Sequence, residues 1–310
     1  MQTVNIKKCV IASALLLLIS VGASVQAATL SVNCAGTSGL TSINAAIKAL
    51  ASFESHGPAT INVAGACHEN IVIQSTNRLT LNAINGASIT DASSGTLDVV
   101  GVIDSRDVTI AGFLINGGAM GISCEGGSWC ELDNDTVQGV PAGGGGIGVF
   151  LFSGATLSGV KLLNNDIGLW VSNGGQVRGD ATIQGSNRGL HMTTGAVVNI
   201  AATITQSREL GAFGTTNVTL NCNACVITGN AAGGVLLRQS SSARFTAGFT
   251  IADNGGPGVA LSELSSALLQ AGTATGNTGG VDVLCGPQFT SARGASNIGG
   301  GTTNCVEPSP

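Results

Sequence analysis

A short phrase recurs between residues 147 and 284, in which an apolar or small residue and a glycine precede a second apolar residue. The recurring glycines are Gly148, Gly168, Gly189, Gly211, Gly234, Gly258 and Gly280. Even spacing of this kind is typical of a solenoid. The apolar runs between Gly, Asn and Ser turns are rich in Val, Ile, Leu and Thr, which indicates strands. The pattern predicts an all-β parallel β-helix with about 20–24 residues per coil.

Within each copy the pattern has a period of two. The first and third residues after the glycine are apolar in most copies, as in Val149 and Leu151 or Leu169 and Val171, and we expect them to point inward. The residue between them then faces outward. This outward column reads Phe150, Trp170, His191, Phe213, Leu236, Ala260 and Asp282. We interpret it as the candidate functional surface.

The segment 1–27 has the features of a signal peptide. Lys7 and Lys8 precede an apolar run, and small residues around Ala27 offer a cleavage site. The run is too short for a membrane span. We therefore expect a secreted protein, periplasmic or extracellular, that has no membrane contact after cleavage. The expected organisation is a signal peptide (1–27), an N-terminal cap with the first strand (28–67), the β-helix (68–284) and a C-terminal cap and tail (285–310).

Removal of the leader leaves eight cysteines, an even number that suits disulfides in an exported protein. Pairing neighbours along the chain predicts four bonds: Cys34–Cys67, Cys124–Cys130, Cys222–Cys225 and Cys285–Cys305. The Cys222 and Cys225 pair leaves an alternative open, because a Cys-x-x-Cys motif can be redox-active or bind a metal. No βαβ pattern surrounds it and no second such pair completes a zinc site, which favours the structural interpretation.

The chain is poor in charge and rich in glycine. Charged residues make up 9% of it, Gly numbers 47, and the net charge is −5. Without Lys7 and Lys8 there are 10 basic and 17 acidic residues, a net charge of −7. This balance argues against nucleic acid as a partner. The stack must be held by backbone ladders and apolar side chains, which suits a β-solenoid.

An amphipathic helix is predicted over 41–50, because Ile43, Ala46, Ile47 and Leu50 share one helical face. Such a helix can cover the open end of a solenoid and prevent association of its strand edges. The segments 59–63 and 69–73 are expected to be the first two strands. The Cys34–Cys67 bond would hold this cap in place.

The opening residues resemble a known group of proteins. The order Ile43-x-Ala-Ala-Ile47, Ala59-Thr-Ile-x-Val63, Gly65, Glu69-Asn-Ile-x-Ile73 and Leu79-Thr-Leu81 is similar to the start of the pectate-lyase-like superfamily, especially its pectin-esterase-like members. The similarity covers this opening segment and the later coil pattern. It implies a right-handed parallel β-helix and specifies the fold rather than an activity.

Aromatic side chains gather on the outward column. Phe150, Phe152, Trp170 and Phe213 fall on outward positions of nearby coils, with His191 among them. Coils stack about 4.8 Å apart, roughly the rise of one sugar in an extended polysaccharide, so these residues are candidate substrate-binding residues. The alternative is that a loop, a tail or a partner subunit covers them. The glycine-rich insertion 138–146, beside Phe150, serves binding or is neutral.

Scarce charges follow the turn residues and form a second candidate group. Asp135, Asp166, Arg188 and Arg208 occupy equivalent positions if the turns have equal length. With His191, they are candidate catalytic residues for acid/base work or for neutralising an acidic sugar. The resemblance implies either two aspartates with an arginine, as in esterases, or a basic residue with calcium held by aspartate, as in lyases. Opposite charges in a ladder can instead only stabilise the stack.

Several familiar signatures are absent from the sequence. It contains no Arg-x-Pro-x-x-Arg, no His between two glycines and no Arg-Pro-Trp, so pectate lyase, polygalacturonase and pectin esterase are each disfavoured. His56 and His68 lie near the cap, away from the repeat. Asp133, Asn134 and Asp135 open a possible calcium site, but the EF-hand glycine and distal Glu do not follow. Asn165, Asn230, Asn254 and Asn277 are better interpreted as an internal ladder of left-handed turn residues.

Two functions remain open on the sequence alone. One is a secreted enzyme, lyase-like or esterase-like, that acts on an extracellular acidic polysaccharide; it needs no cofactor other than, at most, calcium. The other is a non-catalytic carbohydrate-binding or surface-interaction protein that uses the aromatic column alone. The missing signatures favour the second, whereas the resemblance favours the first by analogy. The sequence does not define an oligomeric state.

Overall fold

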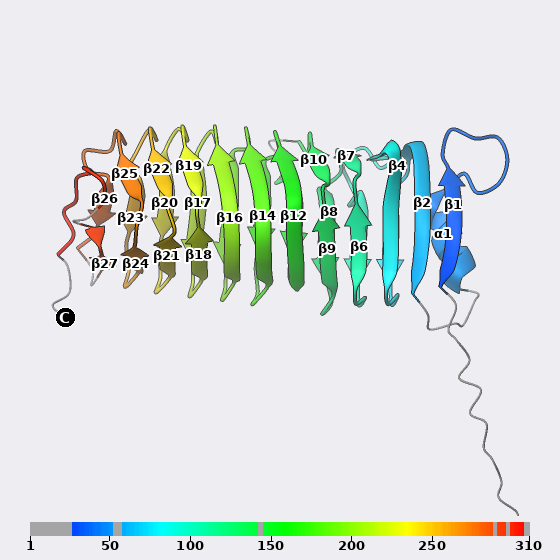
Figure 1. The fold of residues 1–310 in the computed structure, drawn as a ribbon, viewed down its shortest axis with the longest axis horizontal. Coiled ribbons are helices and arrows are strands. Elements are labelled where there is room, and N and C mark those ends of the chain that lie inside the picture. The colour runs from blue at the N-terminus through cyan, green and yellow to red at the C-terminus, as the bar shows by residue number, and fades with distance from the viewer. Residues whose placement is uncertain (1–26, 52–57, 142–144, 288–289, 296–297, 307–310) are drawn as a thin grey trace, which may run out of the picture.

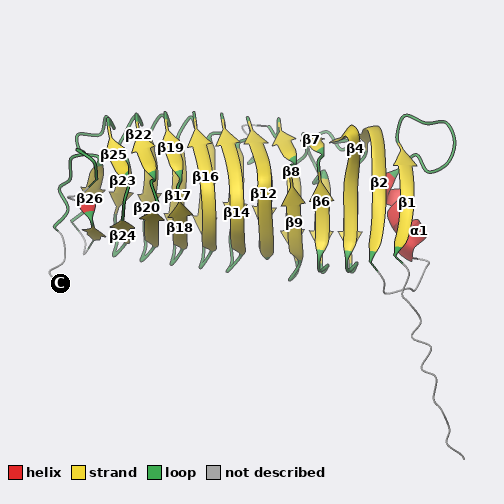
Figure 2. Cartoon of the chain, viewed as in Figure 1, coloured by secondary structure: helices red, strands yellow, loops and turns green. Residues whose placement is uncertain are grey.

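The chain winds into a parallel β-solenoid of about ten turns, as the computed structural model shows in Figure 1. It describes residues 27–51, 58–141, 145–287, 290–295 and 298–306. The predicted signal peptide, except for Ala27, and His56 lie outside the described residues. Almost all regular structure is strand (Figure 2). No helix in the described part of the chain is long and apolar enough to cross a membrane.

One side of the solenoid is a sheet of ten parallel strands, one from each turn. We call it the ten-stranded sheet. In chain order its strands are β3 (Ile71–Gln74), β5 (Val100–Ile103), β8 (Met120–Glu125), β11 (Ile147–Leu151), β13 (Ile167–Val171), β15 (Arg188–Thr193), β17 (Leu210–Thr215), β20 (Gly233–Leu237), β23 (Val259–Leu261) and β26 (Val283–Cys285).

The remaining strands form two further parallel ladders, which long strands connect into one 17-stranded sheet. Ladder I contains β1 (Ala28–Asn33), β2 (Ala59–His68), β4 (Leu79–Thr90), β6 (Val108–Ala111), β9 (Trp129–Asp133), β12 (Gly154–Leu163), β14 (Gln176–Gln184), β16 (Val197–Thr205), β18 (Thr219–Asn223), β21 (Ser242–Thr246), β24 (Ser266–Leu269) and β27 (Ser291–Arg293). Ladder II is formed by the second halves of β2, β4, β12, β14 and β16 with β7 (Leu114–Asn116), β10 (Thr136–Gln138), β19 (Val226–Thr228), β22 (Thr250–Ala252) and β25 (Thr273–Thr275).

The recurring glycines are explained by the approach of successive coils. A Cβ on Gly189 would lie 2.4 Å from the carbonyl oxygen of Gly211 and 2.4 Å from Cγ2 of Ile204. A Cβ would also lie 2.4–2.9 Å from the carbonyl oxygen of the equivalent residue in the next coil at five other glycines, namely Gly148, Gly168, Gly211, Gly234 and Gly258. A larger residue at any of these six positions would push the coils apart, which explains why each of them is glycine.

The predicted internal ladder is present at the turn between ladder II and the ten-stranded sheet. Asn254 Oδ1 accepts hydrogen bonds from the backbone N–H and side-chain amide of Asn230, at 3.0 and 2.9 Å. Asn277 Oδ1 receives the same two bonds from Asn254. The predicted left-handed conformation of these asparagines is wrong. The positive φ belongs to the preceding residue in each coil: Asn164, Gly185, Gln206, Gly229, Asp253 and Gly276.

The last coil departs from the predicted register. Val283 pairs with Val259, which makes Asp282 the equivalent of Gly258, so Gly280 does not continue the column of earlier glycines. Asp282, predicted to face outward, is buried and closes the ladder by accepting bonds from Asn277 and Thr302. Burial alone would raise the pKa of Asp282, but these hydrogen bonds hold it below its usual range.

The predicted helix is present at the N-terminal end of the solenoid, and the strands at the two ends differ from the prediction. Helix α1 (Ile43–Ala51) packs on β1, β2 and β3, and the Glu69 carboxylate accepts bonds from its first turn at Ser42 Oγ, Ile43 N and Asn44 N. The first strand, however, is β1, which the sequence pattern did not reveal. At the other end β27 extends ladder I past Cys285.

All four predicted disulfides are present, namely Cys34–Cys67, Cys124–Cys130, Cys222–Cys225 and Cys285–Cys305. Cys222 and Cys225 are both buried, which favours the structural interpretation of that pair.

Candidate functional site

The predicted outward column forms a continuous line of rings across four coils of the ten-stranded sheet. The pairing of β11, β13, β15 and β17 places Phe150 beside Trp170, Trp170 beside His191, and His191 beside Phe213. Phe152 follows two residues after Phe150, at the end of β11, and its ring contacts Phe150 at 4.3 Å between centroids. We call these five residues the aromatic row.

The rings of the row contact one another in sequence. The centroids of Phe150 and Trp170 are 5.4 Å apart with an edge-to-face arrangement, and those of Trp170 and His191 are 4.9 Å apart with nearly parallel planes. His191 and Phe213 are tilted at 5.2 Å. Phe150 and His191 are buried, Trp170 and Phe213 are half-buried, and Phe152 is 38% exposed. The row therefore offers solvent a narrow apolar strip rather than a set of open ring faces.

His191 is neutral in this setting. Burial lowers its pKa to about 4, with a smaller contribution from the nearby positive charge of Arg188. Its Nδ1 atom is buried and has no hydrogen-bond partner among the described residues. Above pH 4 the imidazole is an uncharged ring that stacks on Trp170, and the nearby guanidinium disfavours its protonation.

A line of hydroxyl groups borders the row on one side. The indole Nε1 of Trp170 donates to Thr193 Oγ1 at 3.2 Å, and Thr193 Oγ1 donates to Ser172 Oγ at 2.7 Å. These bonds fix the orientation of the indole. Neither polar partner was identified from the sequence. Each lies two residues after a row position, Thr193 at the end of β15 and Ser172 just after β13, and this offset is the available signal.

Charged and amide groups border the row on the other side. Arg188 lies with its guanidinium 5.5 Å from the ring centroid of Phe213, and its Nε donates to Glu209 Oε2 at 2.9 Å. Arg208 Nη1 donates to Asn187 Oδ1 at 3.3 Å, and the Asn187 amide donates to Asp166. The structure thus brings Asp166, Arg188 and Arg208 together. It adds Glu209 and Asn187, which flank the predicted residues in the sequence.

Asp135 does not belong to this group. It lies at the bend between ladders I and II, is 0% exposed, and accepts a hydrogen bond from Phe113 N at 2.9 Å. Burial raises its pKa to about 8, and its Oδ2 atom has no partner among the described residues. The prediction failed because equal turn lengths were assumed, whereas Asp135 precedes β10 at a different corner of the coil. Enclosed in the core, Asp135 has no route to a polysaccharide.

The described residues around Asp133 do not form a set of oxygen ligands for calcium. Asn134 donates to Asp133 Oδ1, while Asp135 points into the core, so the three residues do not converge. In the described part of the chain, one group of three potential ligands has atoms close together, namely Cys34, Cys67 and Glu69. The two sulfurs are joined in a disulfide and the carboxylate binds the start of α1, so this group does not fit a metal.

Comparison with known proteins informs the fold. No family model matches the chain, and no curated protein matches it. It is similar to the enzymatically active domain of tailspike protein 2 from bacteriophage CBA120, with a TM-score of 0.63, 12% identity, and coverage of 85% of this chain and 47% of that one. It spans about half the length of that tailspike chain. It is also similar to pectin methylesterase from Aspergillus niger, with a TM-score of 0.41, 13% identity, and coverage of 85% and 89%.

Proposed function

We propose that this is an exported protein that binds an extracellular polysaccharide along the aromatic row. The observation that carries the proposal is the alignment of Phe150, Trp170, His191 and Phe213 on four consecutive outward positions of one sheet. An apolar strip that runs along the solenoid and is bordered by hydroxyl and amide groups suits the alternating apolar and polar character of a sugar chain. Export is supported by the four disulfides and by the leader-like segment 1–27.

Acidic polysaccharides are the first class to test. Arg208 is exposed and binds only the neutral Asn187 among the described residues, so it is free to meet a sugar carboxylate. Arg188 is less available, because Glu209 already accepts from it. Without the leader the chain has 10 basic and 17 acidic residues, and this net charge of −7 opposes a polyanion at long range, so binding would depend on these local cations.

Trp170→Ala tests the row. Loss of a partly exposed indole contact of about 1 kcal/mol is expected to weaken binding of polygalacturonate or alginate oligosaccharides roughly fivefold, as measured by isothermal titration calorimetry. Val72→Ala is the matched control, because Val72 occupies the same outward column at the N-terminal end and is 52% exposed. If wild type and both variants bind equally, or if wild type binds none of these oligosaccharides, the aromatic row is only packing.

Enzymatic action on the same polysaccharide is a second candidate, favoured by the neutral imidazole of His191 in the row and the nearby guanidinium of Arg188 at its border. The tailspike domain with the similar fold is described as enzymatically active. A lyase-type step would use Arg188 to neutralise a uronate carboxylate and His191 to accept a proton. The esterase type is less supported, because burial of Asp135 leaves Asp166 without the expected second aspartate.

Arg188→Ala separates the two candidates. In an enzyme this substitution is expected to abolish turnover of a uronate polymer and leave part of the binding, because a developing charge loses its partner. Turnover is measured as absorbance of unsaturated products or as released alcohol. The absence of turnover in wild type, on polymers that it binds, would eliminate the enzymatic candidate and leave the binding protein.

A further inference from the structure

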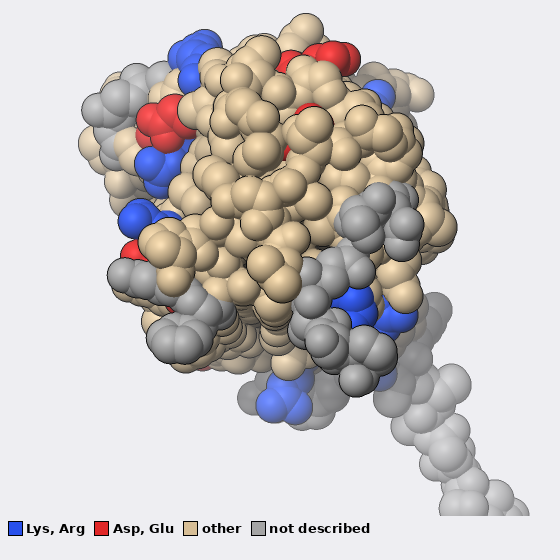
Figure 3. Space-filling view, turned by 90° about the vertical axis from the view of Figure 1, so that its left-hand side faces the viewer, with Lys and Arg blue, Asp and Glu red and all other residues tan. Residues whose placement is uncertain are grey.

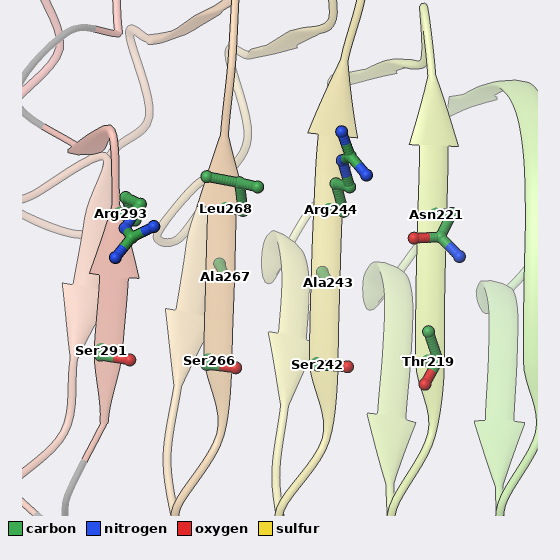
Figure 4. A pocket seen from close by; sticks show the side chains of 10 residues that line it. All are labelled: Thr219, Asn221, Ser242, Ala243, Arg244, Ser266, Ala267, Leu268, Ser291 and Arg293. Atoms are coloured by element: carbon green, nitrogen blue, oxygen red, sulfur yellow. The ribbon is translucent and has the colours of Figure 1, made fainter.

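A second surface, on ladder I, carries a column of polar side chains that the aromatic row does not involve. The pairing of β14, β16, β18, β21, β24 and β27 aligns, in order, Arg178, Asn199, Asn221, Arg244, Leu268 and Arg293. Two residues earlier in each strand, the last four coils carry Thr219, Ser242, Ser266 and Ser291. Figure 4 shows the part of this surface from Asn221 to Arg293, with the serine and threonine side chains beside the column.

The surface along this column is hollowed. One hollow of about 380 Å³ lies over β18 to β27, and a second of about 630 Å³ lies over β14 to β21. They share Asn221 and Arg244 in their linings and therefore form one groove parallel to the solenoid axis. Small residues form its floor and the long side chains of the column rise from it, because serine and threonine alternate with arginine and asparagine along these strands.

The groove is locally positive in a protein of low charge. Arg244 and Arg293 are exposed, and neither has an ion-pair or hydrogen-bond partner among the described residues. By contrast, Arg188 and Arg238 lie beside glutamates, and Arg178 packs on Trp129 and binds Thr156. No aspartate or glutamate lines either hollow. Seen from the C-terminal end, most of the described surface carries no charge (Figure 3).

The spacing of the two arginines indicates the distance between anionic groups in a matching ligand. Arg244 and Arg293 lie two coils apart in one column, which corresponds to about 9.6 Å at about 4.8 Å per coil. This is roughly the length of two sugars in an extended chain. Leu268, between them, offers an apolar contact to the intervening sugar. The asparagine amides add hydrogen-bonding capacity, since Asn221 donates to Asn199 and its own side-chain carbonyl has no partner among the described residues.

We propose that this groove binds an extended acidic polysaccharide with an anionic group on every second sugar, held by Arg244 and Arg293. The class of ligand rests on the proposed function, but the surface is a separate one. Single-stranded nucleic acid fits less well, because no aromatic side chain lines the groove to stack a base.

The primary test uses short hyaluronan oligosaccharides, in which every second sugar carries a carboxylate, and the double variant Arg244→Gln/Arg293→Gln. Each arginine is expected to contribute roughly fivefold in affinity, so the double variant binds on the order of 25-fold more weakly in calorimetry at low salt. Arg106→Gln is the matched control, because it removes one exposed cation outside the groove. Thermal unfolding of each variant confirms that the fold is intact. Unchanged affinity in the double variant overturns the proposal, as does equal weakening by Arg106→Gln or a lack of binding by wild type.

A second variant tests the spacing itself. Leu268→Arg places a cation on the intervening coil and is expected to shift preference toward polygalacturonate, which carries a carboxylate on every sugar. A variant that improves both polymers equally shows attraction without register and overturns the assignment of one anion per two coils.

Failure of this inference and failure of the proposed function are distinguishable. Trp170→Ala leaves groove binding unchanged, and the arginine variants leave binding at the aromatic row unchanged. If Trp170→Ala alone abolishes hyaluronan binding, the groove is refuted and the row is retained. If only the arginine variants abolish it, the groove is retained.

Discussion

Asp135 gives the sharpest test of the structure, because a carboxyl group without a counter-charge lies in the core. It is fully buried between β9 and β10, with one oxygen bound to Phe113 N and the other without a partner among the described residues. Asp135→Asn keeps the shape and the acceptor for Phe113 N while removing the ability to ionise. The expected result is a protein whose free energy of unfolding depends less on pH.

The sign and size follow from the pKa of Asp135. Burial raises it from 3.8 to about 8, so between pH 4 and pH 8 the folded protein holds a proton that the unfolded chain has released. Stability from this group is complete below pH 4 and is lost as the pH rises toward 8. At about 1.4 kcal/mol per pH unit, the loss has a ceiling on the order of 6 kcal/mol. Entry of water or movement of the side chain would reduce it.

The assay is urea denaturation at pH 4, 5, 6, 7 and 8 without reductant, with the difference between variant and wild type plotted against pH. Other groups cancel in this difference, including His191, whose lowered pKa acts in the opposite direction between about pH 4 and 6.5. Asp107→Asn, at an exposed position, is the control. We expect the free energy of unfolding of Asp135→Asn, relative to that of wild type, to rise by several kcal/mol from pH 4 to pH 8. Parallel curves for wild type and Asp135→Asn would show that Asp135 is ionised in the folded protein and would refute the buried placement.

Three further predictions concern the fold. Inserting one residue between Leu190 and His191 reverses the faces of β15 and should severely lower the thermal midpoint; an unchanged midpoint would contradict the register. Asn254→Ala leaves buried groups of two coils unpaired and should cost on the order of 3 kcal/mol in urea denaturation, whereas a cost near zero would mean that water replaces the amide. Reducing Cys34–Cys67 should loosen the N-terminal cap and cause association detectable by light scattering; a monomer of equal stability would refute the capping role.

The coil arrangement is predictable because its constraints are local and repeat. At Gly189 a side chain would collide with the next coil, so glycine marks the same point of every turn from Gly148 to Gly258. Val149 and Leu169 point inward because side chains alternate along a strand with a fixed period of two, and both follow the glycine of their coil directly. The first strand, β1 (Ala28–Asn33), escaped prediction because it directly follows the predicted signal peptide and was assigned to the cap.

The candidate site was only partly predictable. The aromatic row lies within strands at a fixed distance from the glycine, so its members share one face whatever the turns do. The charged residues lie in turns, where length varies. One residue separates Ser186 from Arg188. In the next coil two residues separate Ser207, the equivalent of Ser186, from Leu210, the equivalent of Arg188. This longer turn leaves Arg208 without a counterpart in the coil before it. Asp135 belongs to another corner altogether, and its burial follows from tertiary packing that no turn pattern records.

The arginine groove follows the same rule as the aromatic row, and the sequence contains the signal. Positions ten residues after Gly168, Gly189, Gly211, Gly234 and Gly258 are Arg178, Asn199, Asn221, Arg244 and Leu268. The pairing of β14 to β24 confirms that this constant offset defines one outward column. From Gly168 to Gly258 the offset is constant, because the extra residues of these coils enter after ladder I. The distance is two residues shorter in the coil of Gly148, where Thr156 pairs with Arg178, and one residue longer in the last coil, where Arg293 follows Asp282. A chemical pattern repeated at a fixed offset in successive coils is therefore a stronger indication of a shared surface than charges that cluster near turns. In this chain Asn199, Asn221 and Arg244 meet that criterion, whereas the charged residues around Asp166 do not.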